Sequence, residues 1–321
     1  MNRAPDGTPY GPRELLGRAL ARGVIRPTLG GPVPLPIARR IQDALGAGAI
    51  GGRPKADVRR GSIAGVPVEV VRRPGASDDH LLLYLHGGGF VVGSPRSHRW
   101  ASTTLATYAR ATVVVPEYRL SPEHPFPAGA DDVTAVYAEV ADRDAPRLTV
   151  AGDSAGGNLA IGLATARRDA GDDRIDALGL ISPWCDLSLP EGSWQWANDP
   201  MLDRDGLDVV GGYCAGGHAV DDPRVSPVHA DLRDLPPTLA QVGGAEAFTT
   251  ETHTLANRAA EQGAPLHLQV WPGMWHVHQA LVGLLPQADR ALRDLGAFLR
   301  DGTIPPDARP AAEVPATAPH P

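Results

Sequence analysis

The stretch RLTVAGDSAGGNLA at residues 147–160 combines a short apolar strand, a tight turn and the start of a helix rich in small residues. Its centre, GDSAG at residues 152–156, has the G-x-S-x-G pattern that is typical of a nucleophile elbow. Gly152 and Gly156 flank the serine because side chains at these positions would collide across the turn. We therefore expect the Ser154 hydroxyl to project from the sheet beside the free N–H groups of a helix N-terminus. A glycine-rich turn with an inert surface serine is the alternative interpretation of the pentapeptide alone.

The pattern of apolar residues around this stretch predicts an α/β fold. Apolar runs predict strands, and segments with helical periodicity lie between them. Strands that alternate with helices imply right-handed crossovers and a mainly parallel central sheet flanked by helices, with ligands bound beyond the carboxyl ends of the strands. The expected strands are residues 66–71, 81–85, 112–116, 147–151, 178–181, 239–242 and 266–271, and the expected helices are residues 98–110, 130–141, 155–169, 251–262 and 286–300.

The segments outside this alternation predict a cap and two loose ends. Residues 12–50 hold two short amphipathic helices with too little apolar surface to stand alone, so they must dock as a lid over a pocket or as a brace. We expect residues 51–302 to form the α/β domain, which would be the catalytic one if Ser154 is a nucleophile. Within it, about residues 187–222 have few strand signals and are expected to be a second part of the cap. We expect residues 1–11 to be flexible, and the Pro- and Ala-rich residues 303–321 to be a disordered tail.

Composition and charge limit the partners of the chain. Its 321 residues carry a net charge of -7, and the two cysteines, Cys185 and Cys214, stand in no metal-ligand spacing. An acidic chain without a basic run argues against a nucleic-acid partner or an anionic membrane surface. The sequence has no signal-peptide core and no apolar run of about 18 residues, so we expect a cytoplasmic protein without a membrane span. We expect neither a metal nor a cofactor.

A serine hydroxyl is a weak nucleophile unless a base lies beside it. The sequence PGMWHVH at residues 272–278 follows the last expected strand, and Gly273 allows a turn that brings an imidazole over the elbow. We predict that His276 is the base. His278 is the alternative, although it also suits the start of a helix. His253 lies on the face of an expected helix and is taken as structural or exposed.

The base in turn needs a carboxylate that fixes its tautomer and stabilises the imidazolium. The loop at residues 243–251, after the strand at 239–242, contains two glutamates and no aspartate. We predict that Glu246 is the acid because it is nearer to the end of the strand, where a short loop can hold it rigidly. Glu251 is the weaker candidate because it opens an expected helix, where a carboxylate suits the helix dipole.

A third segment supplies hydrogen-bond donors for a negatively charged oxygen. HGGG at residues 86–89 directly follows the buried strand at 81–85. Glycines allow backbone amides to approach a substrate closely, and attack on an acyl carbon produces an oxyanion that needs such donors. His86 is expected to shape the loop. The expected donors are the N–H groups of Gly87, Gly88, Gly89 and Ala155.

Three segments in this order resemble the hormone-sensitive-lipase family of α/β-hydrolases, the bacterial family IV esterases. They are HGGGF at residues 86–90, YRLSPEHPFPA at 118–128 and GDSAGG at 152–157, and the resemblance extends over roughly residues 12–300. It implies an α/β-hydrolase fold with a cap built from the N-terminal helices and from an insertion after the sixth strand. It also implies that Ser154 is the nucleophile and His276 the base.

The sequence departs from this family at the acid. The family usually has an aspartate in a D-x-L-x-D-E loop, whereas this chain has EAFTTE at residues 246–251. Glu246 therefore takes the place of the aspartate, and its longer side chain must bend to reach the same imidazole nitrogen.

The resemblance and the motifs together predict a serine carboxylesterase that hydrolyses short-to-medium acyl esters through an acyl-enzyme intermediate. A non-catalytic small-molecule receptor of the same fold is one alternative, since the family contains a plant hormone receptor that has lost its base. An amidase or acyltransferase with the same triad is another. The oligomeric state stays open; many members of the family pair through the edge strand near the C-terminus, so a homodimer is one candidate by analogy.

Overall fold

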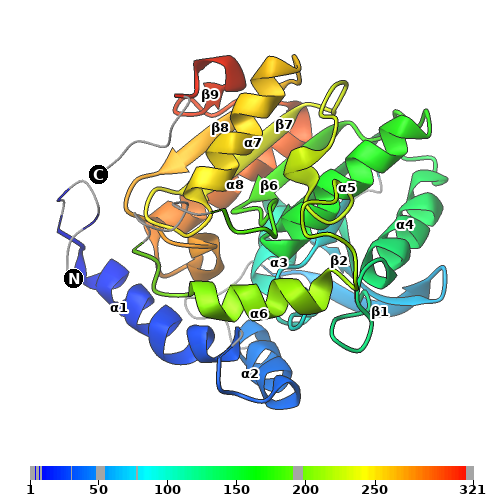
Figure 1. The fold of residues 1–321 in the computed structure, drawn as a ribbon. Coiled ribbons are helices and arrows are strands. Elements are labelled where there is room, and N and C mark those ends of the chain that lie inside the picture. The colour runs from blue at the N-terminus through cyan, green and yellow to red at the C-terminus, as the bar shows by residue number, and fades with distance from the viewer. Residues whose placement is uncertain are drawn as a thin grey trace.

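The computed structural model of the protein describes residues 4, 7, 9–29, 31–47, 55–76, 79–190 and 198–315. In these residues one sheet has the strand order β1-β2-β4-β3-β5-β6-β7-β8-β9 (Figure 1). Neighbours from β4 to β8 are parallel, and β1, β2 and β9 pair antiparallel at the two edges. The predicted α/β-hydrolase fold is confirmed. The strands are β1 Asp57–Ile63, β2 Val66–Arg72, β3 His80–Leu85, β4 Thr112–Pro116, β5 Arg147–Asp153, β6 Ala177–Ile181, β7 Thr238–Gly243, β8 Leu266–Trp271 and β9 Arg309–Pro310.

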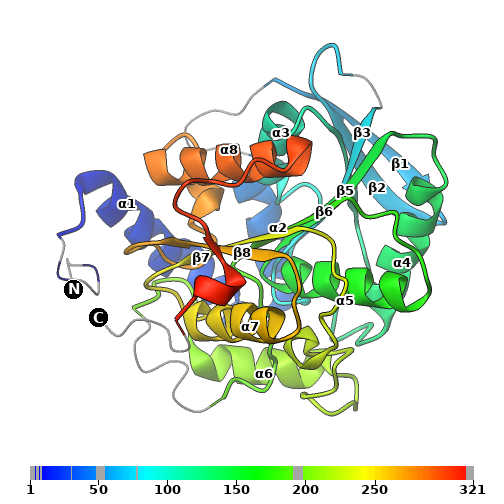
Figure 2. The same ribbon diagram turned by 90° about the horizontal axis from the view of Figure 1, so that it is seen from above.

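Helices cover both faces of this sheet. Viewed from above, α3 (Arg99–Tyr108) and α8 (Pro286–Asp301) lie on one side, and α4 (Ala128–Ala141), α5 (Ala155–Asp169) and α7 (Thr249–Glu261) lie on the other (Figure 2). The apolar run of β3 shows why the sequence requires two layers. Leu83 and Leu85 face the core under α4 and α5, whereas Leu82 and Tyr84 face the core under α3 and α8. A strand buried on both faces reads as a continuous apolar run.

The cap elements are α1 Pro12–Leu20, the short helical turns Ala21–Ile25 and Arg26–Thr28, α2 Leu35–Ala47 and α6 Arg204–Cys214. Helices α2 and α6 meet in a separate apolar cluster beside the sheet, whereas Ala21 packs in another cluster with Met274 and Trp275. Ala38 of α2 packs in one cluster with Leu207 and Val210 of α6 and with Val91, which follows the HGGG segment. The N-terminal helices and the insertion therefore dock on the same region. Residues 48–50 and 191–197 of the expected cap lie outside the described residues.

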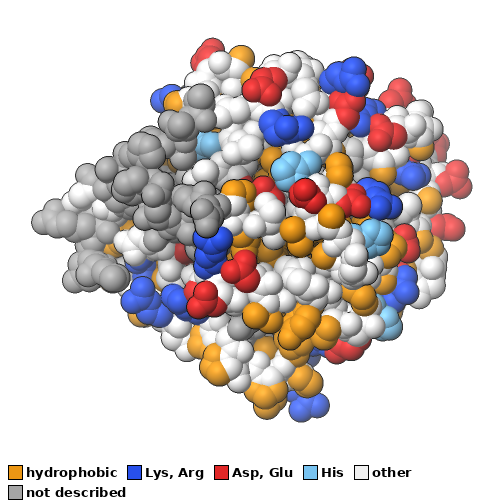
Figure 3. Space-filling view, viewed as in Figure 1, with side chains coloured by type: hydrophobic (Ala, Val, Ile, Leu, Met, Phe, Trp, Pro, Cys, Tyr) orange, Lys and Arg blue, Asp and Glu red, His pale blue; other side chains and the backbone are white. Residues whose placement is uncertain are grey.

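The outer face of the cap carries exposed apolar side chains. Figure 3 shows hydrophobic side chains gathered over α2 and α6. Ile37 and Val209, for example, are 52% and 51% exposed. In the part of the chain that the structure describes, every helix is too short or too polar to cross a lipid bilayer.

Some described residues within the two segments that were expected to be loose make defined contacts. Tyr10 is buried and accepts a hydrogen bond from Arg18 Nη1 at 3.1 Å. Near the C-terminus, Pro310 pairs with His267 of β8, and Ala311 and Val314 are buried in the core under α7. A Pro- and Ala-rich composition suggested disorder, but the missing N–H of a proline is tolerated on an edge strand, and two small apolar side chains anchor the segment. Residues 1–3, 5, 6, 8 and 316–321 lie outside the description.

The first prediction concerns the close contact between the elbow and β3. A Cβ on Gly156 would overlap with the carbonyl oxygen of Leu85, which is backbone and cannot move aside. We expect Gly156→Ala to lower the free energy of unfolding by about 3 kcal/mol, measured by urea denaturation. Gly162→Ala in the same helix is the matched control, because a Cβ there meets no atom within 4 Å. The control should keep or slightly raise the stability, and equal urea midpoints for the two variants would contradict the account.

Candidate active site

Ser154 lies at the sharp junction between β5 and α5. Its backbone has φ 53° and ψ -120°, a conformation that is costly for a residue with a side chain. Two backbone hydrogen bonds join it to β6 and the loop after β6: Ser154 N donates to Ile181 O at 2.9 Å, and Trp184 N donates to Ser154 O at 3.0 Å. The strained turn is thus fixed from the neighbouring strand β6.

His276 meets this serine from the loop that follows β8. Its Nε2 lies 3.0 Å from Ser154 Oγ, and its Nδ1 lies 3.3 Å from Glu246 Oε1. All three residues are buried, at 7%, 1% and 2% exposure for Ser154, His276 and Glu246. Phe248 contacts the imidazole edge-on, with ring centroids 4.8 Å apart. The structure therefore brings together the three residues predicted as nucleophile, base and acid.

Glu246 reaches the imidazole because its carboxylate bends back over its own loop. Its second oxygen, Oε2, accepts hydrogen bonds from Ser182 Oγ and from the backbone N of Gly243, each at 2.7 Å. These two donors hold the longer side chain in one orientation. Burial raises the pKa of Glu246, and the hydrogen bond and charge of His276 only partly oppose this effect.

The alternative base and acid lie elsewhere. His278 is buried against Trp271, with ring centroids 5.7 Å apart, and burial lowers its pKa to about 3. Glu251 Oε1 accepts a hydrogen bond from the backbone N of Cys185 at 2.8 Å. His253 is buried in α7. These residues have structural environments away from Ser154.

The loop at residues 86–89 divides its donors between two tasks. Gly87 N donates to Asp153 Oδ1 at 3.1 Å, so this N–H is not free for an oxyanion. Within the described residues, no group accepts a hydrogen bond from the N–H of Gly88, Gly89 or Ala155. Gly88 has φ +117°, a conformation that suits glycine. Of the four expected donors, the three that remain are therefore those of Gly88, Gly89 and Ala155.

One carboxylate near the base was missed by the sequence analysis. Asp199, from the insertion, is 8% exposed. Its Oδ2 accepts hydrogen bonds from the backbone N of His276 at 3.2 Å and of Ala247 at 3.1 Å. Arg18 of α1 holds the neighbouring Asn198 through its carbonyl and side-chain oxygens at 2.8 and 2.9 Å. The Asp-Pro pair at this point signals only a turn, and nothing in its spacing indicates a partner 77 residues later.

A small cavity of about 80 Å³ lies directly at these groups. Its walls come from the elbow, the HGGG segment and both parts of the cap, and include Ser154, His276, Gly88, Gly89, Ile25, Leu29, Gln42, Met201, Leu202, Leu207 and Val210. The cap therefore overlies the serine, and the space beside the serine is small.

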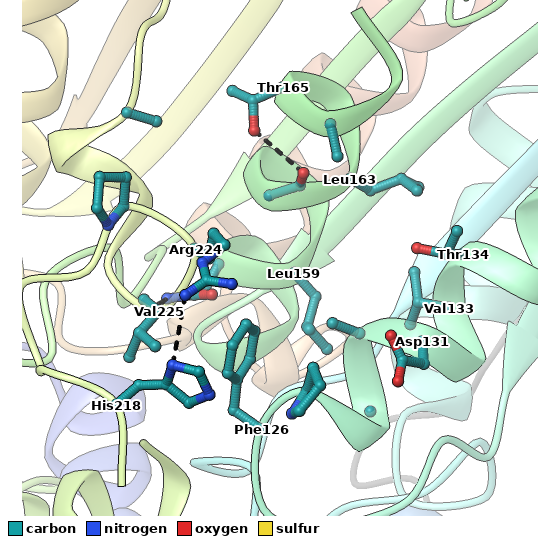
Figure 4. A pocket seen from close by; sticks show the side chains of 18 of the residues that line it. Phe126, Asp131, Val133, Thr134, Leu159, Leu163, Thr165, His218, Arg224 and Val225 are labelled. Atoms are coloured by element: carbon teal, nitrogen blue, oxygen red, sulfur yellow. Dashed lines mark hydrogen bonds between the residues drawn. The ribbon is translucent and has the colours of Figure 1, made fainter. Parts of the chain in front are cut away.

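A larger cavity of about 570 Å³ lies on another side of α5. Leu159 of α5 and Phe126 and His218 from the surrounding loops line it (Figure 4). Neither Ser154 nor His276 lines this larger cavity. It comes nearest to the small cavity, in sequence terms, at Phe90, which follows the HGGG segment, and at Cys214, which follows Val210 on α6. Although it is larger, it is therefore not the cavity that holds the reactive groups.

The polar residues of the site do not fit a metal. No group of three or more His, Cys, Asp or Glu side chains in the described ranges could hold an ion. The chemistry that the arrangement can perform is proton transfer from a hydroxyl to an imidazole, followed by nucleophilic attack.

Comparison with known proteins bears on the fold and the family of the chain. A family model for the alpha/beta hydrolase fold matches residues 82–280. An acetyl-hydrolase from Streptomyces hygroscopicus is 40% identical over 235 residues, which are 72% of this chain and 79% of that protein. The solved structure of EstE5 superimposes with a TM-score of 0.85 at 32% identity, covering 91% of this chain and 99% of EstE5. An esterase from the bacterial hormone-sensitive lipase (HSL) family gives a TM-score of 0.83 at 34% identity, covering 91% and 98%.

The second prediction tests the tautomer of the base. In Glu246→Gln, the side-chain oxygen takes the place beside Ser182 and Gly243, so the amide NH₂ faces His276 Nδ1. The imidazole then carries its proton on Nε2 and cannot accept one from Ser154. We expect kcat to fall by about 10⁴-fold.

Stability should change in the opposite direction to activity in this variant. The raised pKa of Glu246 means that the folded protein holds this proton more tightly than the unfolded chain. The free energy of unfolding of the wild type therefore falls as the pH rises from the ordinary pKa of glutamate to the raised pKa of Glu246. Glutamine cannot ionise, so the variant does not show this fall. Urea denaturation should show the variant gaining relative to wild type as the pH rises. Glu251→Gln is the control and should keep kcat. If Glu251→Gln lost kcat and Glu246→Gln kept it, Glu251 and not Glu246 would be the acid.

The third prediction concerns Asp199. Asp199→Ala leaves the buried N–H groups of His276 and Ala247 without their acceptor. We expect the free energy of unfolding to fall by about 2 kcal/mol and kcat to fall by about tenfold or more, because the base loses its position. Asp205→Ala, at an exposed position of α6, is the control. Wild-type kcat in Asp199→Ala would show that this carboxylate does not position the base.

Proposed function

Since the chain belongs to the bacterial hormone-sensitive-lipase family of α/β-hydrolases, we propose that it is a carboxylesterase whose catalytic triad is Ser154, His276 and Glu246. The observation that carries the proposal is the distance of 3.0 Å between Ser154 Oγ and His276 Nε2, with Glu246 on the opposite ring nitrogen. This is the hydrogen-bond reach that a nucleophile and its base require.

The reaction proceeds in two halves. His276 Nε2 accepts the proton of Ser154 as Oγ attacks the ester carbonyl carbon, and Glu246 stabilises the resulting imidazolium. The carbonyl oxygen becomes an oxyanion, which the N–H groups of Gly88, Gly89 and Ala155 stabilise. The C–O bond to the alcohol breaks as the imidazolium returns the proton to the leaving oxygen. Water then attacks the acyl-enzyme with the same base, which releases the acid and regenerates the serine.

The size of the cavity supports esters with short acyl chains. A cavity of about 150 Å³ holds a benzene molecule, and the space at Ser154 is about 80 Å³. An acetyl or propionyl group therefore suits this space, and longer chains require the cap to move. The name of the similar Streptomyces protein, an acetyl-hydrolase, supports the same preference.

The experiment is hydrolysis of p-nitrophenyl esters of increasing chain length by wild type and by Ser154→Ala. We expect kcat to fall by about 10⁴-fold or more in the variant, and kcat/KM of the wild type to be highest for acetate and propionate and to decline for longer chains. Equal rates for wild type and variant would exclude Ser154 as the nucleophile. Binding of esters without turnover would favour a receptor, and a maximum at long chains would overturn the cavity argument.

A further inference from the structure

Asp153 connects the elbow to the HGGG segment. It precedes Ser154 in the chain, and its Oδ1 accepts hydrogen bonds from Tyr84 Oη at 2.7 Å and from Gly87 N at 3.1 Å. The second of these bonds fixes the start of the segment whose next two N–H groups, those of Gly88 and Gly89, are free. The orientation of the Asp153 carboxylate therefore sets where these two donors point.

His98 holds the other oxygen of this carboxylate. Its Nε2 lies 3.3 Å from Asp153 Oδ2, and the two side chains are 10% and 3% exposed. Burial alone would raise the pKa of Asp153. The electrostatic attraction of His98 and the hydrogen bonds from His98 and Tyr84 outweigh burial, so the pKa of Asp153 is lowered. A buried negative charge beside a forming oxyanion would be costly if no donor compensated it.

The cap reaches His98 through two serines. Ser97 Oγ lies 2.8 Å from His98 Nδ1, and Ser97 N donates to Ser94 Oγ at 3.1 Å. Ser94 Oγ in turn donates to the carboxylate of Asp43 on α2. A continuous polar chain, which we call the Asp43–Asp153 chain, thus runs from the cap helix through Ser94, Ser97 and His98 to the residue before the nucleophile.

A second contact from α2 reaches the same loop. Arg39 Nε donates to the carbonyl oxygen of Val91 at 2.8 Å, just beyond the HGGG segment. Helix α2 therefore holds this loop directly and also holds it through Asp153. A lid that only covered a pocket would not need either connection.

We propose that His98 is a positioning residue for the oxyanion donors, and that α2 sets its orientation through Asp43, Ser94 and Ser97. When α2 is docked, the Asp43–Asp153 chain fixes Gly87 and thereby aims the N–H groups of Gly88 and Gly89 at the substrate. The N-terminal part of the cap thus completes the oxyanion site as well as closing the cavity. This inference rests on the proposed ester hydrolysis.

The direct test replaces His98 by leucine and by glutamine. His98→Leu removes the donor to Asp153, and we expect kcat for p-nitrophenyl acetate to fall by about tenfold to 100-fold with KM within about threefold, because loss of a whole oxyanion donor costs about 10² to 10³ in kcat. The Ki of an aryl trifluoromethyl ketone, whose adduct with serine carries an oxyanion, should rise by the same factor. His98→Gln keeps an N–H donor and should recover most of kcat.

His80→Leu is the matched control. His80 is as buried as His98, at 6% against 8%, and also makes two hydrogen bonds, to Ala109 O and Thr149 Oγ1, but it lies at the start of β3. It should lose stability and keep kcat and the Ki. An equal loss of kcat in His80→Leu, or a rise in KM alone in His98→Leu, would overturn the proposal.

Asp43, at the other end of the Asp43–Asp153 chain from the nucleophile, provides an independent test. We expect Asp43→Ala to lower kcat by about threefold or more, and the double variant with His98→Leu to be no slower than His98→Leu alone, because the two residues act through one chain. Arg40→Ala on the same helix, at an exposed position, is the control. Additive effects would contradict the proposal, as would wild-type kcat in Asp43→Ala.

The variants distinguish a failure of the role proposed for His98 from a failure of the proposed function. If His98→Leu does not fold, Asp43→Ala decides, and a wild-type Ki for the trifluoromethyl ketone in that variant overturns the proposal. If Ser154→Ala retains hydrolysis, the proposed function itself fails. If Ser154→Ala is inactive while His98→Leu keeps kcat, only the role of His98 fails.

Discussion

The contact on which the site depends joins two segments that are 122 residues apart, Ser154 and His276. It exists because β5 and β8 run in the same direction in one sheet, so that the loops after their carboxyl ends meet at one edge. The strained backbone of Ser154 persists because the apolar cores on both sides of β5 leave it no alternative. Packing of the sheet therefore supplies the energy that holds the hydroxyl beside the imidazole.

Two buried carboxylates flank this contact, and their environments differ. Burial dominates at Glu246 and raises its pKa, whereas charge and hydrogen bonds from His98 and Tyr84 dominate at Asp153 and lower its pKa. Glu246 faces the proposed base, and Asp153 faces the loop that carries the proposed oxyanion donors. The cap contacts both halves, through Asp199 at the base and through Asp43 at the loop. The cap thus hydrogen-bonds to both segments that carry the proposed reactive groups.

The sequence predicted those features that depend on short-range patterns. A few adjacent residues were enough to predict the elbow, the apolar run of β3 and the order of the loops. The family resemblance followed from these short motifs. Strand β1 was not predicted because its residues DVRRGSI are mostly polar and exposed. They form a strand because they pair antiparallel with β2. Asp199 and the engagement of Gly87 by Asp153 also could not be predicted, because they depend on contacts between distant segments that no periodicity records.

The measurement that tests the central claim most directly is covalent labelling with diethyl p-nitrophenyl phosphate, followed by mass spectrometry of intact protein and peptides. A hydroxyl activated by His276 should take up one diethylphosphoryl group per chain, on the peptide that contains Ser154, with loss of esterase activity in proportion to labelling. In His276→Ala the same labelling should be slower by about 10³-fold or more. Inactivation by a label on another residue, or labelling of Ser154 at the wild-type rate in His276→Ala, would contradict the account.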